Sequence, residues 1–553
     1  MSLLSQSQLG IFYACQDLGE HDGNYQVPAL WKLPGSIDVD RLKMALEQVV
    51  GNHPYILSRI EIEESKGSSN GVEGEFKGSP SGVEVGFREC SMDECDAVVV
   101  VREIESIDDV RSTFCRTMDL LHDRLFRMEI YKTPDGNWLY LDFHHILIDG
   151  TAWYGLLLPE IDKAYRGEAL AQEPMDGNDI ANEEYQLRQS EEWQKQREWY
   201  MKEFGDAEEV DSMPTATSLT PNPSPIERGT EASPKGGGWR GPLETMFHLP
   251  VSREAIEAIC QKYGVKESVV FTAAWGKMLA NYTAEDRAFF TTIFTGRSDV
   301  RTRQTLTMMV HTLPVFMQMP STQTIDDWLR AVRQQQKATR EKAVYSFSDL
   351  HQDLGLRGDI MFGYHGKVAK TSAAEGFLLD GHVLNGEDLR ISIPGITLDG
   401  QVLLRGVQAE FKGSSRGIQT EFKGSSVQEV QEEDYDLRIT YRDDVYSGEM
   451  IEGMAEAYGA ILNSMATAET ISDLAAASRQ QLQWLDKQNP EKLPEYPEDK
   501  TVLNLFKESV EKYPDNECCV FEDHRYTYRE IDSITDNLAG QIIRGVQTEF
   551  KGS

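Results

Sequence analysis

Apolar positions along this chain follow two spacings, which predict a mixture of helices and strands. In residues 37–50 apolar side chains recur every three or four positions, Asp38 is a candidate N-cap, and Gly51 would end the helix. The same spacing predicts further helices over 252–263, 266–281 and 325–336. Strict alternation of apolar and polar residues predicts strands over 138–143, 288–294, 313–319 and 437–442. Strands and helices mixed in this way, without a regular βαβ repeat, favour layered α/β lobes.

Several stretches interrupt these patterns and are predicted to be inserted loops. Residues 217–238 are rich in proline and end in three glycines, without apolar periodicity. A phrase ending in EFKGS occurs near 65–84, twice within 405–426, and again at 544–553. Its irregular distances exclude a stacked repeat, which needs a constant period. A docking peptide is the alternative, but solvent-exposed insertions are favoured because the surrounding pattern resumes after each internal copy.

The composition narrows the functional classes. The 553 residues include 55 Lys+Arg and 91 Asp+Glu, for a net charge of −36. A surface with this much negative charge repels phosphate backbones and anionic lipids. We therefore expect neither nucleic-acid nor membrane partners. Seven scattered cysteines without a CxxC pair indicate a reduced, cytoplasmic protein, and no apolar run approaches the length of a membrane span.

The segment 137–150 contains the strongest candidate chemistry. Apolar residues of its strand share one face, and continued alternation places His145 on that face and His144 on the opposite one. The strand then breaks into a loop that reaches Asp149 and Gly150, where glycine permits a tight turn. A histidine held at the end of a buried strand suits a general base or a hydrogen-bond donor. A metal site is disfavoured, because adjacent histidines on a strand point to opposite faces.

The sequence HHILIDG at 144–150 resembles the HHxxxDG signature of condensation domains in nonribosomal peptide synthetases, which are relatives of chloramphenicol acetyltransferase. Further segments resemble other motifs of that family and extend the resemblance to about residues 1–480: 4–16, 38–60, 182–204, FTGRSD at 294–299, 306–319 and, weakly, 345–364. The sequence departs from the family at Leu57, which replaces the inner of two motif arginines while Arg59 remains. The final motif lacks its usual Ser-Arg-Asn-Pro run.

The resemblance implies two chloramphenicol-acetyltransferase-like α/β lobes in a V arrangement, with the signature loop at their junction. The N-terminal lobe would span 1–175 with an insertion near 65–84, and the C-terminal lobe 176–480 with insertions near 217–238 and 405–426. A linker at 481–500 would precede 501–553, which resembles the N-terminal part of an adenylation domain, with a helix capped by Thr527 and Glu530. No phosphate-binding loop follows, so we expect this truncated fragment to be inert toward ATP.

The activity implied by the resemblance is acyl transfer that forms an amide bond between two carrier-bound substrates. His145 would accept the proton of the attacking amine, hold the amine, or stabilise the oxyanion, and the sequence leaves these roles open. His144 would pack the loop, and Gly150 would keep a tunnel open for the pantetheine arm. Asp149 is expected to be a structural carboxylate paired with Arg297, because a buried carboxylate needs a cation and Arg297 belongs to the family's Gly-Arg element.

The resemblance also implies substrates and partners. We expect no cofactor bound by this chain; its substrates would arrive on the 4'-phosphopantetheine of peptidyl or acyl carrier proteins in trans, from other synthetase modules, or as acyl-CoA. Heterocyclisation is disfavoured, because that subfamily replaces the two histidines by aspartates. An epimerisation-type member of the same fold and a non-catalytic carrier-docking scaffold remain as alternatives. The donor, the acceptor amino acid and its chirality stay open.

Overall fold

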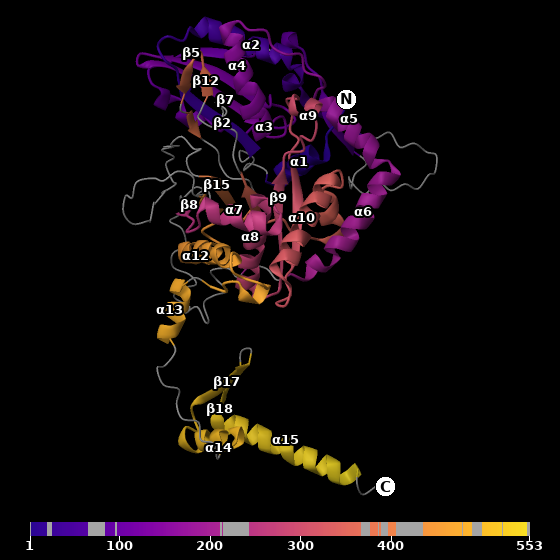
Figure 1. Ribbon diagram of the computed structural model, residues 1–553, viewed down its shortest axis with the longest axis vertical. Coiled ribbons are helices and arrows are strands. Elements are labelled where there is room, and N and C mark those ends of the chain that lie inside the picture. Colours follow the sequence, from indigo (N-terminus) through magenta and orange to yellow (C-terminus); the bar gives the residue numbers. More distant parts are fainter. Residues whose placement is uncertain are drawn as a thin grey trace. The chain divides into compact units, whose positions relative to one another are not determined.

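The computed structural model contains two compact units, residues 1–482 and 483–553 (Figure 1). The structure describes residues 2–18, 25–64, 83–94, 97–210, 213, 243–365, 377–384, 386–388, 396–404, 435–477, 479–488, 500–521 and 524–549. The insertions expected at 217–238 and 405–426 lie outside these residues, as does all of 65–84 except its last two positions. None of the described helices combines the length and the hydrophobicity needed to cross a lipid bilayer.

The first lobe is built on a five-stranded sheet in the order β14-β2-β7-β6-β5. Strands β2, β7 and β6 run antiparallel, with Val27 and Phe126 both opposite Phe143 of the central strand β7. The strands are β2 (Gln26–Lys32), β5 (Val100–Glu103), β6 (Phe126–Thr133), β7 (Gly136–His144) and β14 (Gly386–Asp388). Buried residues of helices α1 (Gln6–Leu18), α2 (Val39–Asn52) and α4 (Leu158–Arg166) form one apolar core with the sheet.

Helix α2 shows how closely the apolar spacing predicts local structure. The Asp38 carboxylate accepts the Arg41 amide at 3.0 Å and caps the helix, as predicted. Six apolar residues on one face are buried against the first-lobe core. Gly51 does not end the helix, which continues to Asn52, because His53 donates its amide to Val49 and closes the last turn.

The second lobe is built on a six-stranded sheet in the order β10-β9-β11-β15-β16-β8. Its strands are β8 (Leu243–His248), β9 (Arg287–Phe294), β10 (His311–Gln318), β11 (Ile360–Tyr364), β15 (Leu398–Leu404) and β16 (Tyr435–Tyr441). Alternate residues of β16 are buried, which confirms the predicted period of two. The core of this lobe includes residues of α7 (Arg253–Tyr263), α8 (Glu267–Thr283), α10 (Ile325–Glu341) and α12 (Gly448–Met465).

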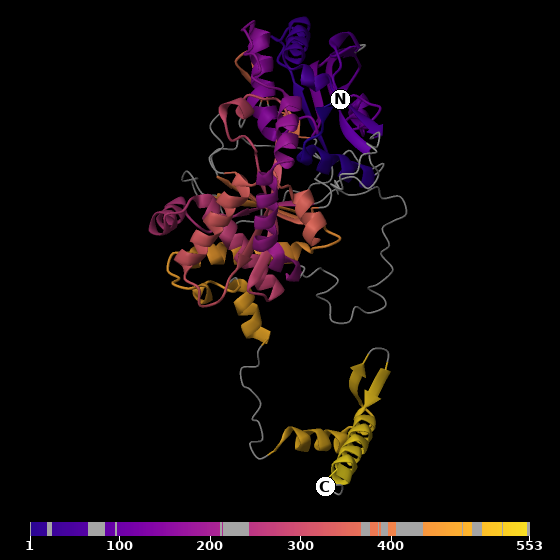
Figure 2. The same ribbon diagram turned by 90° about the vertical axis from the view of Figure 1, so that its right-hand side faces the viewer.

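Two consecutive helices connect the lobes along the chain. Helices α5 (Gly177–Arg188) and α6 (Glu191–Phe204) run from the first lobe to the second, as both ribbon views show (Figures 1 and 2). There α6 packs with α11 (Phe347–Leu354) in a separate apolar cluster. Arg188 of α5 binds both carboxylate oxygens of Asp349 in α11, at 2.6 and 2.9 Å. The connection is therefore held by packing and by a two-nitrogen ion pair.

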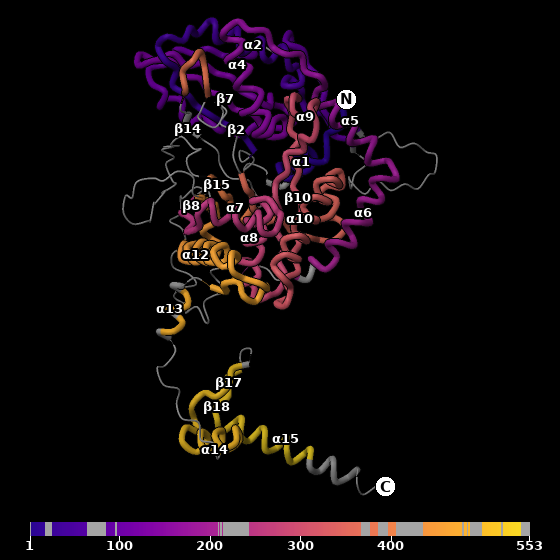
Figure 3. The backbone as a smooth tube through the Cα atoms, in the orientation of Figure 1, coloured from indigo at the N-terminus to yellow at the C-terminus, as the bar shows by residue number. Residues whose placement is uncertain are grey.

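Residues 377–384 and 386–388 lie in the first lobe, although the division at residue 175 assigns them to the second. The hairpin of β12 (Phe377–Leu379) and β13 (His382–Leu384) lies in the first lobe (Figure 3). Its residues Phe377, Leu379 and Leu384 belong to the first-lobe core. Strand β14 then pairs antiparallel with β2 at the edge of the first-lobe sheet. An unpaired strand edge offers free backbone groups to any extended segment, and the sequence does not show which segment takes them.

The smaller helices and strands complete the two lobes. A three-stranded sheet combines β1 (Ser2–Leu3), β3 (Arg59–Glu64) and β4 (Val83–Arg88), and it contributes Ile60 and Phe87 to the first core. Short helices α3 (Gly150–Ala152) and α9 (Val300–Arg303) follow the two segments that the sequence analysis singled out. They mark the place where the lobes meet.

Beyond residue 488, the C-terminal unit has the order helix, strand, strand, helix. Helix α13 (Arg479–Gln488) takes up the first half of the expected linker, and 489–499 lie outside the described residues. The unit continues with α14 (Val502–Lys512), β17 (Glu517–Phe521), β18 (His524–Thr527) and α15 (Tyr528–Glu549). The Glu530 amide donates to the Thr527 hydroxyl at 3.3 Å, which confirms the predicted cap. Helix α15 includes residues 544–549, where an exposed loop was expected.

Candidate active site

The two adjacent histidines lie where β7 ends and its turn begins. His144 is the last residue of β7, and its amide donates to the Leu125 carbonyl at 2.8 Å. The amide of His145 donates to the Tyr25 carbonyl at 2.6 Å, beside the partner strand β2. His144 is fully buried, whereas His145 is only partly buried. The His145 backbone is therefore tied to Tyr25, and its side chain is less buried than that of His144.

The ring of His144 is engaged inside the protein. The Ile146 amide donates to His144 Nδ1 at 3.2 Å, and His144 Nε2 lies 3.8 Å from Cys15 Sγ. Because Nδ1 accepts a hydrogen bond, the ring proton belongs on Nε2, where it faces the sulfur. The ring also lies beside Tyr25, with 6.4 Å between the ring centroids. His144 thus holds the turn that follows it, which is a packing role.

Asp149 is a fully buried carboxylate that accepts four hydrogen bonds from three donor groups. It caps α3 by accepting the Ala152 amide at 2.8 Å. Arg297 Nη2 donates to its two oxygens at 3.1 and 3.0 Å, and the Met309 amide donates to Oδ2 at 3.0 Å. The expected pairing with Arg297 is present, and a single nitrogen, Nη2, serves both carboxylate oxygens. Together these bonds fix the carboxylate in place where the two lobes meet.

Arg297 also forms hydrogen bonds with the backbone of the segment between β9 and β10. Its Nη1 donates to the carbonyls of Thr302 and Thr305 at 2.6 and 2.7 Å, and Nη2 donates to the Thr307 carbonyl at 2.8 Å. The side chain is 2% exposed. One guanidinium therefore neutralises the carboxylate of the first lobe and folds the second-lobe segment that reaches it. The lobes meet at this pair.

The two glycines of these motifs differ in what they require. Gly296 has φ +70°, and a Cβ there would lie 2.2 Å from the Met309 carbonyl oxygen, so only glycine fits beside Arg297. Gly150 has no positive φ, so the expectation that it permits a tight turn is wrong. It opens helix α3, and a Cβ on it would meet nothing within 4 Å. That Gly150 leaves room for a substrate arm stays a prediction.

Gln8 contacts the same turn and was not among the residues predicted from sequence. Its Nε2 donates to the Ile146 carbonyl at 3.0 Å and to the Tyr55 hydroxyl at 2.7 Å. The Ser5 amide donates to Gln8 Oε1 at 3.0 Å. The motif at 4–16 contains Gln8, but a glutamine in a helix is usually solvated. Its spacing among apolar residues was the only signal that it faces the core.

A buried charged cluster lies beside the junction. His53 Nε2 is 2.6 Å from Glu160 Oε2, and Nδ1 is 3.0 Å from Glu173 Oε2. Burial of the ring lowers the pKa of His53, but the two carboxylates outweigh this effect and raise it to about 9. Glu173 also accepts the Leu306 amide at 2.5 Å, on the segment that Arg297 folds. The imidazolium therefore braces both lobes.

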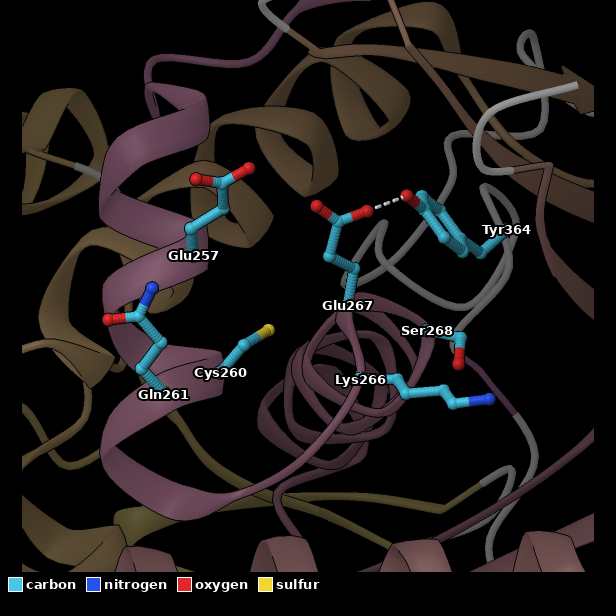
Figure 4. Close-up of a pocket in the computed structure, with 7 residues that line it drawn as sticks. All are labelled: Glu257, Cys260, Gln261, Lys266, Glu267, Ser268 and Tyr364. Atoms are coloured by element: carbon cyan, nitrogen blue, oxygen red, sulfur yellow. Dashed lines mark hydrogen bonds between the residues drawn. The ribbon is translucent and has the colours of Figure 1, made fainter. Parts of the chain in front are cut away.

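A separate pocket lies on the second lobe and includes none of these residues. Its lining comes from α7, α8 and β11: Glu257, Cys260, Gln261, Lys266, Glu267, Ser268 and Tyr364 (Figure 4). The hydroxyls of Tyr364 and Tyr435 both donate to the Glu267 carboxylate. Burial and the nearby Glu267 raise the pKa of the Cys260 thiol to about 11, so it is protonated and unreactive at neutral pH.

The family model described as Condensation domain matches residues 1–365. Bacitracin synthase 3 of Bacillus licheniformis is 24% identical over 532 residues, which cover 95% of this chain and 8% of that protein. This chain spans roughly a tenth of the length of the curated relatives it matches. The family match ends before residue 501, so the adenylation-domain interpretation of 501–553 stays a prediction.

Solved structures share the fold. The first condensation domain of the calcium-dependent antibiotic synthetase, in complex with a substrate analogue, has a TM-score of 0.58 at 17% identity, covering 86% of this chain and 98% of that chain. A four-domain nonribosomal peptide synthetase bound to AMP and glycine has a TM-score of 0.61 at 17% identity, covering 98% of this chain and 39% of that chain. The two-lobed α/β architecture is thus that of known condensation domains.

Proposed function

The chain belongs to the condensation-domain family, and from that membership we propose that it forms an amide bond between an acyl thioester and the amine of an aminoacyl group held on a carrier protein. The observation that carries the proposal is the placement of His145. It follows a buried strand, its backbone is fixed, and it is the less buried of the two motif histidines. A rigidly held imidazole is the group that such a reaction needs most.

The chemistry is one of alignment and proton transfer. The amine attacks the thioester carbonyl, a C–N bond forms, and the C–S bond breaks as the thiolate leaves. His145 would accept the proton that the amine loses and return it to the departing sulfur, or hydrogen-bond the tetrahedral oxyanion. A thioester is already activated, so positioning the two substrates supplies much of the rate.

The other motif residues would support His145 without touching the reacting atoms. His144, with its ring engaged by Ile146 and Cys15, would hold the turn. Asp149 would hold the lobes together through Arg297. The open space at Gly150 would admit a thin substrate arm, such as the phosphopantetheine of a carrier protein. The donor would arrive on a carrier protein of another module or as an acyl-CoA.

The test is amide formation between an acyl-carrier protein and an aminoacyl-carrier protein, measured by intact mass of the carrier-bound product. His145→Ala should lower turnover by about 100-fold or more, since a positioned general base contributes 10²–10⁴-fold. His122→Ala, which truncates an exposed histidine, is the matched control and should behave like the parent. Full turnover in His145→Ala, with an unchanged melting temperature, would remove His145 from the mechanism.

The same assay separates the alternatives. A non-catalytic carrier-docking scaffold would bind both carrier proteins and yield no amide, with or without His145. An epimerisation-type member would change the configuration of a carrier-bound residue without a change in mass, which chiral chromatography of the released amino acid detects. Amide product that depends on His145 is the result that supports condensation.

A further inference from the structure

The turn after His145 depends on contacts to Ile146. The Ile146 amide donates to His144 Nδ1 at 3.2 Å, within the motif itself. The Ile146 carbonyl accepts Gln8 Nε2 at 3.0 Å, across 138 positions of sequence. The Leu147 amide, in the same peptide group as that carbonyl, donates to the His144 carbonyl at 3.0 Å. Gln8 therefore fixes the orientation of the peptide group that closes the turn around His145.

The Gln8 side chain can take only one orientation. Each amide hydrogen has an acceptor, the Ile146 carbonyl or the Tyr55 hydroxyl, and Oε1 accepts the Ser5 amide at 3.0 Å. A flipped amide would place two oxygens against each other at Ile146 and two donors against each other at Ser5. The residue is 1% exposed, so water cannot replace a lost partner.

Tyr55 is itself fixed by the helix that leads to the second lobe. A Cβ on Gly177, the first residue of α5, would lie 2.3 Å from Tyr55 Cζ. The Tyr55 ring therefore packs directly against the backbone of α5, where any side chain would clash with it. The ring of Phe87 packs edge-on against Tyr55, with centroids 5.4 Å apart. The hydroxyl that orients Gln8 is thus placed by contacts of the Tyr55 ring with two elements, α5 and β4.

We propose that Gln8, oriented by Tyr55, is a positioning residue that sets the place of the His145 ring for catalysis. This inference rests on the proposed function of His145. Gln8 contacts the turn and has no need to touch a substrate. Acyl transfer needs the reacting atoms aligned at about 3–3.5 Å, and a 1 Å displacement of a catalytic group costs about 10²-fold in rate. A tilt of the Ile146 peptide is a direct route to such a displacement.

The variant that isolates this contact is Gln8→Glu. A carboxylate of the same shape still accepts the Ser5 amide, and the Tyr55 hydroxyl can turn to donate to it, but the Ile146 carbonyl loses its donor. We expect kcat to fall by about 10–100-fold while KM for both carrier-bound substrates stays within about twofold. Gln16→Glu, the same exchange on the exposed face of α1, is the control and should match the parent.

Tyr55→Phe provides a second, milder test, which applies even where Gln8→Glu fails to fold. It removes the hydroxyl that orients Gln8 and keeps the ring, so kcat should fall by about 3–10-fold at unchanged KM. The positioning role is overturned if either folded variant has the same kcat as the parent, or if only KM changes. A purely structural role would lower the melting temperature and leave kcat of the folded fraction unchanged.

Failure of the proposed function is distinguishable from failure of this inference. A parent chain that forms no amide overturns the proposed function. Crystal structures of the parent and of Gln8→Glu then decide the positioning role without any activity. The Ile146 carbonyl and the His145 ring should both be displaced in the variant. An unmoved His145 ring overturns the role of Gln8.

Discussion

At the scale of single residues, two buried charges hold the lobes together. Asp149 of the first lobe receives Arg297 and the Met309 amide from the second, and His53 of the first lobe shares Glu173 with the Leu306 amide of the second. Both contacts end on the segment between β9 and β10. A buried charge without its partner is destabilising, so separating the lobes at either contact would cost free energy.

The Asp149–Arg297 pair should behave as a coupled unit. Asp149→Ala and Arg297→Ala should each lower the free energy of unfolding by about 3–5 kcal/mol, because each leaves one buried charge unpaired. The double variant should lose much less than the sum. Chemical denaturation of the four chains gives the coupling energy. The exposed pair Arg301–Glu183 is the control, because solvent screening leaves such a pair with little or no coupling. Additive losses at Asp149 and Arg297 would contradict the prediction.

His53 should make stability depend on pH. Its folded pKa of about 9 lies above the ordinary value of 6.5, so its contribution is fully present below pH 6.5 and is lost as pH rises through 9. The difference corresponds to about 3 kcal/mol at most. His53→Gln, which cannot be charged, should therefore lose more stability relative to the parent at pH 6 than at pH 9.5. Urea denaturation at both values measures this, and an equal loss at both would show that His53 is not charged in the fold.

At the scale of elements, the connection between β9 and β10 decides how the lobes meet. It leaves β9 through Gly296, wraps around the Arg297 guanidinium, and delivers the Met309 amide to Asp149 before β10 begins. Three of its backbone carbonyls accept hydrogen bonds from the Arg297 side chain, so contacts within the segment set its shape. This segment positions the junction more directly than either sheet does.

Gly296→Ala should disrupt this connection. The alanine backbone would have to keep a positive φ, and its methyl group would lie 2.2 Å from the Met309 carbonyl oxygen. Gly167→Ala is the matched control, since Gly167 also has a positive φ but open space around its Cβ position. We expect a loss of about 1–2 kcal/mol in the control, from the backbone conformation alone, and a clearly larger one for Gly296→Ala. Equal losses in thermal denaturation would show that the close contact is relieved at little cost.

At the scale of the whole molecule, the two units differ in how they treat apolar side chains. Residues 1–482 bury theirs in apolar cores, whereas the C-terminal unit leaves several exposed. Val502 is 84% exposed, Leu503 64% and Ile542 58%, on helices whose apolar residues are spaced for burial. None of the hydrophobic side chains described in this unit is buried. Faces of this kind favour association with other apolar surfaces.

Removal of residues 489–553 should leave the first unit intact. We expect the shortened chain to keep the melting temperature of the major transition within about 2 °C and to keep amide-forming activity, because the apolar cores lie within residues 1–482. It should also bind less of a hydrophobic dye and self-associate less at high concentration. Calorimetry and light scattering measure both. A loss of soluble protein would show that the C-terminal unit supports the first.

The sequence by itself determined the local elements and the candidate chemistry. Helix α2 with its Asp38 cap and strand β16 with its alternation were predicted, because their periods are set by neighbours a few residues away. The histidine motif was found in the same way. The Asp149–Arg297 contact was expected from the cost of a buried carboxylate together with a family motif.

Only the tertiary structure decided which distant segments complete the site. The Gln8 contact to Ile146 spans 138 positions and the His53 contact to Glu160 spans 107. Strand β14 joins the edge of β2 from more than 350 residues away. A hydrogen-bonding side chain or a strand edge accepts many partners of the right chemistry, and nothing in the local pattern names one. The choice is made when the packed cores bring particular backbones together, which is why the positioning contacts of His145 became visible only in the fold.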